Sequence, residues 1–131
     1  MILSIDVGIR NLAMCLLNET NNLVEEWDVS GVPPEHKDGI YVSLRKHLDE
    51  RPWVLTAQTI LIEKQPDRNK KMISVMHFLH AYFIIKCPTQ RLFSMTHATR
   101  FQMLRDLEKL NTISARRLRL RGAKPLSVKT R

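Results

Sequence analysis

Short hydrophobic runs alternate with turn-forming residues over the first thirty positions of the chain. Residues 1–7, 11–17 and 23–29 are rich in Ile, Leu, Val, Ala and Met, and the segments 8–11 and 18–22 between them carry Gly and Asn. Such runs, bounded by turn-forming residues, are typical of strands joined by tight connections. The pattern predicts an antiparallel meander of three strands.

The rest of the chain alternates hydrophobic positions at helical spacing with short continuous runs. Spacing of three and four residues predicts a helix, whereas a continuous run of about six residues is typical of a strand buried on both faces. Pro33 and Pro34 lead into the first helix, and Arg51-Pro52 ends it. We predict helices over residues 35–51, 67–86 and 97–121, and strands over residues 58–63 and 90–95.

Length and composition restrict the class of protein. A chain of 131 residues has room for one hydrophobic core. It contains no apolar run of about 18 residues and no features of a signal peptide, so we expect a soluble, intracellular protein without a membrane span. Cys15 and Cys87 lie far apart in apolar surroundings, which favours buried free thiols over a disulfide or a nucleophile.

The net charge of +8 is concentrated in one segment. Residues 100–131 contain ten Lys or Arg and two acids, a balance of +8, whereas residues 1–99 contain eleven charges of each sign. Uncompensated positive charge suits contact with a polyanion, although a solvated tail has the same composition. The candidate nucleic-acid contacts in this basic segment are Arg116, Arg117, Arg119, Arg121 and Lys124.

Two carboxylates stand at the ends of predicted strands. Asp6 ends the first apolar run and is followed by Gly8, where the backbone can turn or approach a ligand closely; Glu63 ends the fourth run. Carboxylates at the tips of neighbouring strands can hold a divalent metal, because hard cations prefer oxygen ligands. The residues favour a metal-dependent phosphodiester site. The alternative makes Asp6 a strand-end cap and Glu63 an ion-pair partner of Lys64 or Arg10.

Polar and basic residues follow both carboxylates. The start of the helix after Glu63 combines exposed backbone N–H groups with cations, which suits phosphate. We assign DNA backbone contact to Gln65, Arg68, Asn69, Lys70 and Lys71. Arg10 and Asn11 either contact DNA as well or close the turn after Asp6. His77 and His80 are three residues apart, but they have no further ligands at metal-binding spacing, so we expect them to be packed or interfacial.

The predicted order of strands and helices is that of the ribonuclease H-like α/β fold, with a mixed five-stranded sheet flanked by helices. Residues 4–13 together with residues 62–72 closely resemble the RuvC-like Holliday-junction resolvases of poxviruses, iridoviruses and other large DNA viruses, with fungal mitochondrial resolvases as relatives. The similarity continues through residues 80–83 and covers about the first 95 residues.

The resemblance implies a Mg²⁺-dependent endonuclease, with Mn²⁺ as a substitute, that resolves four-way DNA junctions in recombination and viral genome processing. Two ions about 4 Å apart stabilise both sides of an in-line displacement. In this family Asp6 would bridge the ions, Glu63 would hold one of them, and two aspartates of a later Lys-Lys-Asp-Asp-like motif would complete the shell. No acidic residue follows Glu108. We therefore expect one domain over residues 1–131 that is incomplete at its C-terminal end and lacks part of the site.

The resemblance also implies a homodimer that binds a two-fold symmetric DNA junction. Large residues outside the helical stripe of residues 67–86, including Phe78 and Tyr82, make this helix the candidate interface. One alternative is a catalytically impaired ribonuclease H-like module that binds nucleic acid. Another is an actin-like sugar kinase, suggested by Asp-x-Gly-x-x-Asn from Asp6 to Asn11, but the chain is too short for the two domains of such kinases. A viral protein in a host cell is the expected setting.

Overall fold

A computed structural model describes residues 1–33, 37, 39–96 and 99 of the chain. The chain forms two compact units, Met1–His97 and Ala98–Arg131. The elements below all belong to the first unit. The helix predicted over residues 97–121 and the five candidate contacts of the basic segment lie outside the described residues.

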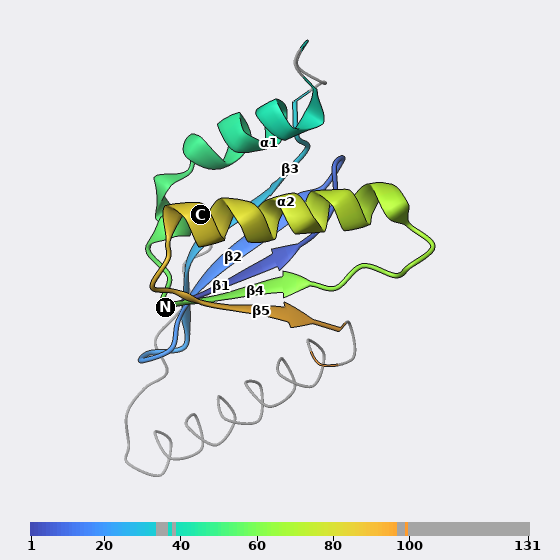
Figure 1. Cartoon of the computed structure of the whole chain (residues 1–131). Coiled ribbons are helices and arrows are strands. Elements are labelled where there is room, and N and C mark those ends of the chain that lie inside the picture. The colour runs from blue at the N-terminus through green and yellow to red at the C-terminus, as the bar shows by residue number, and fades with distance from the viewer. Residues whose placement is uncertain (34–36, 38, 97–98, 100–131) are drawn as a thin grey trace, which may run out of the picture. The chain divides into compact units, whose positions relative to one another are not determined.

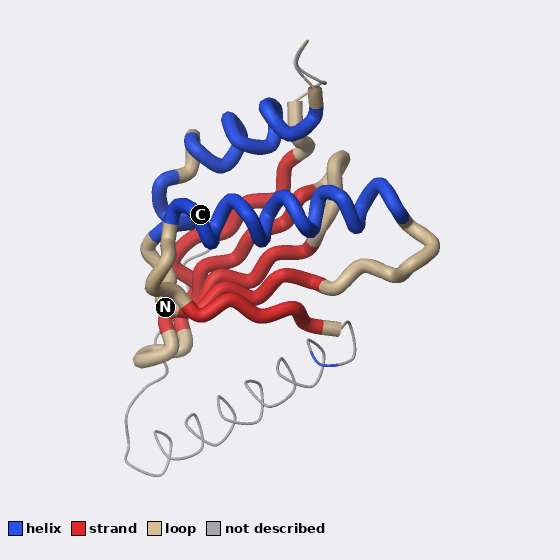
Figure 2. The backbone as a smooth tube through the Cα atoms, viewed as in Figure 1, coloured by secondary structure: helices blue, strands red, loops and turns tan. Residues whose placement is uncertain are grey.

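The described residues form five strands and two α-helices, with one short 3₁₀ helix (Figures 1 and 2). Their order is β1 (Ile2–Asp6), β2 (Leu12–Asn18), β3 (Leu23–Ser30), α1 (Ile40–Asp49), η1 (Pro52–Leu55), β4 (Thr59–Glu63), α2 (Lys70–Lys86) and β5 (Arg91–Met95). The strands make one sheet in the order β3-β2-β1-β4-β5. The first three strands pair antiparallel, and β4 pairs parallel with both β1 and β5. The predicted meander and mixed sheet are confirmed.

The two described α-helices both start later than the sequence pattern indicated. The helix predicted from residue 35 begins at Ile40, after Gly39, whose φ of 97° is outside the helical region. The helix predicted from residue 67 begins at Lys70, because Asn69 caps it: the Asn69 Oδ1 accepts a hydrogen bond from the backbone N–H of Met72 at 3.3 Å. The 3₁₀ helix that follows Arg51 was not predicted.

The core lies between the sheet and the two helices. Figure 2 shows α2 crossing in front of the strands. Alternate residues of β1 and β2 are buried, whereas the first four residues of β4 are all buried, as its continuous hydrophobic run predicted. The largest fully buried hydrophobic side chains are Leu3, Ile5, Leu12, Met14, Leu44, Leu48, Val54, Ile60, Ile62, Leu79 and Phe83.

Two side chains that were expected to be surplus on helix α2 are part of its packing. Tyr82 is only 5% exposed, and its hydroxyl donates to Asp49 Oδ1 at 2.8 Å, which ties α2 to α1. Phe78 packs against the core and stacks on Tyr41, with ring centroids 5.3 Å apart. The assignment of Tyr82 to a partner surface is therefore wrong, whereas that of the half-buried Phe78 stays a prediction. Exposed apolar side chains on this helix come instead from Ile84 and Ile85, which are 60% and 77% exposed.

Candidate metal and nucleic-acid site

The register between β1 and β4 determines where the two carboxylates lie. These strands run parallel, and Ile5 is the partner of Ile62. Asp6 and Glu63 are the next residue on each strand, and both are half-buried. In open α/β sheets, ligands bind at the carboxyl ends of the parallel strands. The prediction that the two carboxylates end adjacent strands is confirmed.

The turn after β1 is tightly packed. A Cβ added to Gly8 would lie 2.5 Å from the carbonyl oxygen of Asn11, so a side chain at this position needs the turn to open. Arg10 and Asn11, at the far end of the turn, are exposed. The connection after β3 lies against the same turn, because the backbone N–H of Val32 donates to the carbonyl oxygen of Ile9 at 2.8 Å.

An open depression joins this turn to the start of α2, although the two segments are about sixty residues apart in the sequence. Its lining residues are Gly8, Ile9, Arg10, Asn11, Asn69, Lys71 and Met72. Arg68 and Lys70 are exposed beside it in the chain. The structure therefore brings together four of the predicted DNA contacts, Arg10, Asn11, Asn69 and Lys71, and the contact with DNA itself stays a prediction.

Gln65 is an exception among these candidates. Its side chain is 8% exposed, and its Nε2 lies 3.4 Å from the carbonyl oxygen and 3.5 Å from Oε2 of Glu63. Its backbone N–H points to the Met76 sulfur at 3.5 Å. Gln65 is therefore largely buried beside Glu63, unlike its exposed neighbours, and its assignment to DNA contact stays a prediction.

A second depression surrounds Glu63 and contains residues that the sequence analysis missed. It is lined by Glu63, Lys64, Gln65, Pro66, Asp67 and Thr96. Lys64 and Asp67 lie close to Glu63 in the sequence, and this proximity could have identified them as candidate site residues. Thr96 follows β5, and it comes to the same end of the sheet because β5 runs parallel to β4, with Met95 as the partner of Glu63.

The donor atoms at this end of the sheet suit a hard cation but do not complete its shell. Within the described part of the chain, no three His, Cys, Asp or Glu side chains are grouped so that they could hold a metal ion. Mg²⁺ takes six oxygen ligands and usually keeps several waters. Asp6 and Glu63 would supply two carboxylates, so other oxygens must fill the remaining positions.

Among the residues that the structure describes, no third His, Cys, Asp or Glu joins the two histidines of α2 in a group that could hold a metal ion. His80 Nε2 lies 3.0 Å from Ser94 Oγ of β5. Burial and the nearby His77 lower the pKa of His80. The packing predicted for His80 is confirmed, whereas His77 is exposed. No described helix is long and apolar enough to span a membrane.

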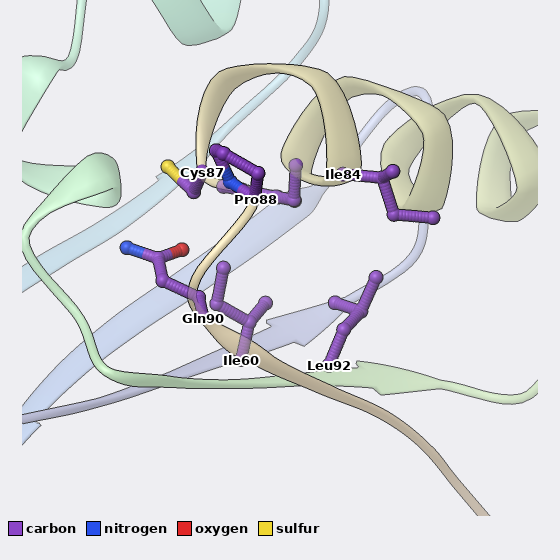
Figure 3. Close-up of a pocket in the computed structure, with 7 residues that line it drawn as sticks. Ile60, Ile84, Cys87, Pro88, Gln90 and Leu92 are labelled. Atoms are coloured by element: carbon purple, nitrogen blue, oxygen red, sulfur yellow. The ribbon is translucent and has the colours of Figure 1, made fainter.

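An apolar cavity lies near the other end of β4 (Figure 3). It has a volume of about 110 Å³ and is lined by Ile60, Phe83, Ile84, Cys87, Pro88, Gln90 and Leu92. Burial raises the pKa of the Cys87 thiol, which disfavours the thiolate form. Cys15 and Cys87 are free, as predicted, although both are half-buried rather than fully buried.

The sheet order and its flanking helices are those of Holliday-junction resolvases, which have a ribonuclease H-like fold. The fowlpox virus resolvase, solved with its substrate Holliday junction DNA, is 19% identical, with a TM-score of 0.51; the match covers 73% of this chain and 61% of that one. The yeast mitochondrial Holliday junction resolvase Ydc2 is 17% identical, with a TM-score of 0.47 and coverage of 89% and 61%.

Residues 1–114 match the model of the poxvirus A22 protein family. The chain belongs to this family, which is a family of Holliday-junction resolvases. The resemblance read from residues 4–13 and 62–72 is thereby confirmed. No curated protein matches the chain. The chain spans 61% of the length of each of the two solved resolvases.

Proposed function

We propose that this protein is a metal-dependent endonuclease that binds and cuts four-way DNA junctions, with Asp6 and Glu63 in its metal site. The observation that carries this proposal is the parallel register of β1 and β4, which puts both carboxylates at one end of the sheet. A depression with basic side chains lies beside the turn that follows Asp6. Membership of the resolvase family supports the same reaction.

In this proposal Asp6 and Glu63 hold Mg²⁺, or Mn²⁺ in its place, through their carboxylate oxygens. Ions held there would supply activation of the attacking water and stabilisation of the leaving oxygen of the phosphodiester. Gln65 packs beside the Glu63 carboxylate and restricts its movement. The family-based expectation adds two aspartates from a later motif, and waters would fill the remaining positions of the shell.

The DNA backbone is held by the depression between the turn and α2. Arg10 and Lys71 supply positive charge, and the amides of Asn11 and Asn69 supply hydrogen-bond donors. Phosphate contacts of this kind position the duplex without reading its sequence. Because they depend on counterion release, binding through them weakens as salt rises.

The test compares metal binding, junction binding and cutting in matched variants. Asp6→Asn and Glu63→Gln should each lower the affinity for Mn²⁺, measured by calorimetry, and abolish Mn²⁺-dependent cutting of a labelled four-way junction. Junction binding in gel shifts should stay close to that of the parent, because phosphate contacts lie elsewhere. Glu26→Gln is the control, since Glu26 is an exposed carboxylate on β3. Mn²⁺ binding and cutting that persist in both site variants would remove these carboxylates from the mechanism.

A second candidate function is junction binding without catalysis. The observation that favours it is that no three His, Cys, Asp or Glu side chains of the described residues are grouped so that they could hold a metal ion. The 131-residue chain would then bind junctions in a salt-dependent manner and cut little even with Mn²⁺. Symmetrical nicks near the branch point that disappear in Asp6→Asn would decide for the endonuclease.

The proposed assembly is a homodimer, since a two-fold symmetric junction is matched most simply by a two-fold symmetric protein. Ile84 and Ile85 are the exposed apolar side chains of α2, the helix predicted to form the interface. Ile85→Glu should shift the protein toward the monomer in analytical ultracentrifugation. An unchanged mass would move the interface away from this helix.

A further inference from the structure

A hydrogen-bonded cluster joins the end of β3 to the end of α1. Arg51 is its donor: Nε donates to Asp28 Oδ2 at 2.9 Å, Nη1 to the carbonyl oxygen of His47 at 2.7 Å, and Nη2 to Ser30 Oγ at 3.2 Å. The hydroxyl of Ser30 donates to the same Asp28 oxygen at 2.7 Å. Two of these four hydrogen bonds, from Arg51 to Asp28 and from Arg51 to Ser30, join two segments that are about twenty residues apart.

Ser30 is the centre of this cluster because all of its bonding capacity is used. A serine hydroxyl has one hydrogen and two lone pairs. Its hydrogen goes to Asp28, and one lone pair accepts from Arg51. His47 Nε2 lies 3.3 Å from the same oxygen, so the neutral ring must carry its proton on Nε2 and donate it to the second lone pair. His47 is 2% exposed, and burial followed by the Arg51 charge lowers its pKa, which favours that neutral form.

The three residue types of a hydrolytic triad are present here without its arrangement. In a triad the carboxylate binds the histidine nitrogen that faces away from the serine. Here Asp28 binds the serine hydroxyl directly and lies 4.0 Å from the same nitrogen, Nε2, that faces Ser30. The cluster therefore holds the backbone in place rather than activating Ser30.

The segment held by this cluster lies against the turn that follows Asp6. Ser30 pairs with Leu12 in the sheet, directly after the turn. Val32 donates its N–H to the carbonyl oxygen of Ile9 at 2.8 Å. A Cβ added to Gly31 would lie 3.0 Å from the carbonyl oxygen of Arg10, so the two backbones are nearly in contact. A displacement of Ser30 would thus be passed directly to residues 9 and 10.

We infer that the cluster of Asp28, Ser30, His47 and Arg51 positions the Ile9–Arg10 backbone, and with it the Arg10 side chain, at the DNA-binding depression. This inference rests on the proposed contact between Arg10 and DNA. The four residues act as positioning residues through two backbone segments. Because they act through the Ile9–Arg10 backbone, their expected effect is on junction binding.

Hydrogen exchange tests the structural half of the inference without any DNA. Ser30→Ala leaves the His47 and Arg51 donors without their acceptor. Losing one such hydrogen-bond partner lowers the free energy of local opening, so we expect the exchange rate of the Val32 amide to rise roughly tenfold. The amides of Leu3 and Ile5 in β1 serve as the reference for global unfolding. Ser30→Thr keeps the hydroxyl and should restore slow exchange. Val32 exchange that is unchanged, or that rises only in step with β1, would overturn the inference.

A double-mutant cycle with Arg10→Ala tests the functional half. In the parent, Ser30→Ala should weaken binding of a four-way junction by about three- to tenfold at fixed salt; in Arg10→Ala the same change should cost less than about twofold, because the residue being positioned is gone. Equal losses in both backgrounds would overturn the inference. If the Arg10→Ala variant binds the junction as the parent does, both the proposed DNA contact of Arg10 and the inference are wrong. If the exchange of the Val32 amide is unchanged in Ser30→Ala, only the inference is wrong.

Discussion

Gly8→Ala is the substitution that most directly tests the turn after Asp6. The added Cβ would lie 2.5 Å from the carbonyl oxygen and 3.1 Å from the carbonyl carbon of Asn11. Close C···O contacts in proteins are about 3.3 Å, so the Asn11 carbonyl must move by roughly 0.8 Å. Both atoms belong to the backbone, so no flexible side chain can give way. Arg10 and Asn11 must shift with the turn.

The expected cost follows from overpacking rather than from backbone strain. Inserting one carbon into a closely packed position typically costs about 1–3 kcal/mol. Gly39→Ala is the matched control: Gly39 has a φ of 97°, and nothing lies within 4 Å of an added Cβ. Its cost of about 1 kcal/mol comes from a conformation that residues with a Cβ rarely adopt. The control therefore lowers stability without moving the turn.

Urea unfolding and junction binding at fixed salt separate the two effects. Gly8→Ala should lower the free energy of unfolding by about 1–3 kcal/mol and weaken junction binding severalfold, whereas Gly39→Ala should lower stability and keep the parent affinity. A Gly8→Ala protein with the parent's urea midpoint would show that the turn relaxes without cost. Equal losses of affinity in both variants would show that binding depends on overall stability and not on the geometry of this turn.

Three further predictions concern stability and charge. Tyr82→Phe removes the 2.8 Å hydrogen bond to Asp49 between the helices and should cost about 1 kcal/mol, seen as a lower urea midpoint; an unchanged midpoint would contradict it. Burial lowers the pKa of His47 and of His80 in the folded protein below the ordinary value of 6.5. As the pH falls, the unfolded chain therefore binds protons before the folded chain does. The free energy of unfolding should fall as the pH drops below about 6.5. A flat profile from pH 8 to 5 would refute this. Deleting residues 116–131 should weaken DNA binding and flatten its salt dependence by about one unit of slope for each lost phosphate contact; identical slopes would identify a solvated tail.

The sequence by itself determined the five strands, the two described α-helices and their order, but not the 3₁₀ helix η1. Run length and turn residues are local properties, so the three-stranded meander and the doubly buried strand β4 could be read directly from them. Asp6 and Glu63 could also be identified from the local sequence, because each carboxylate ends a hydrophobic run. The motif around these two residues was sufficient to identify the family.

Only the tertiary structure decided which side chains meet. Gln65 looks like its exposed polar neighbours in the sequence, but the chain's path after β4 buries it beside Glu63. Tyr82 lies outside the narrow helical stripe, and it is buried because α1 supplies Asp49 as a partner for its hydroxyl. The cluster around Ser30 joins residues about twenty positions apart, a separation that no periodic pattern encodes. Such contacts depend on the positions of the helices and strands relative to one another, and those positions are determined by the packing of the whole core.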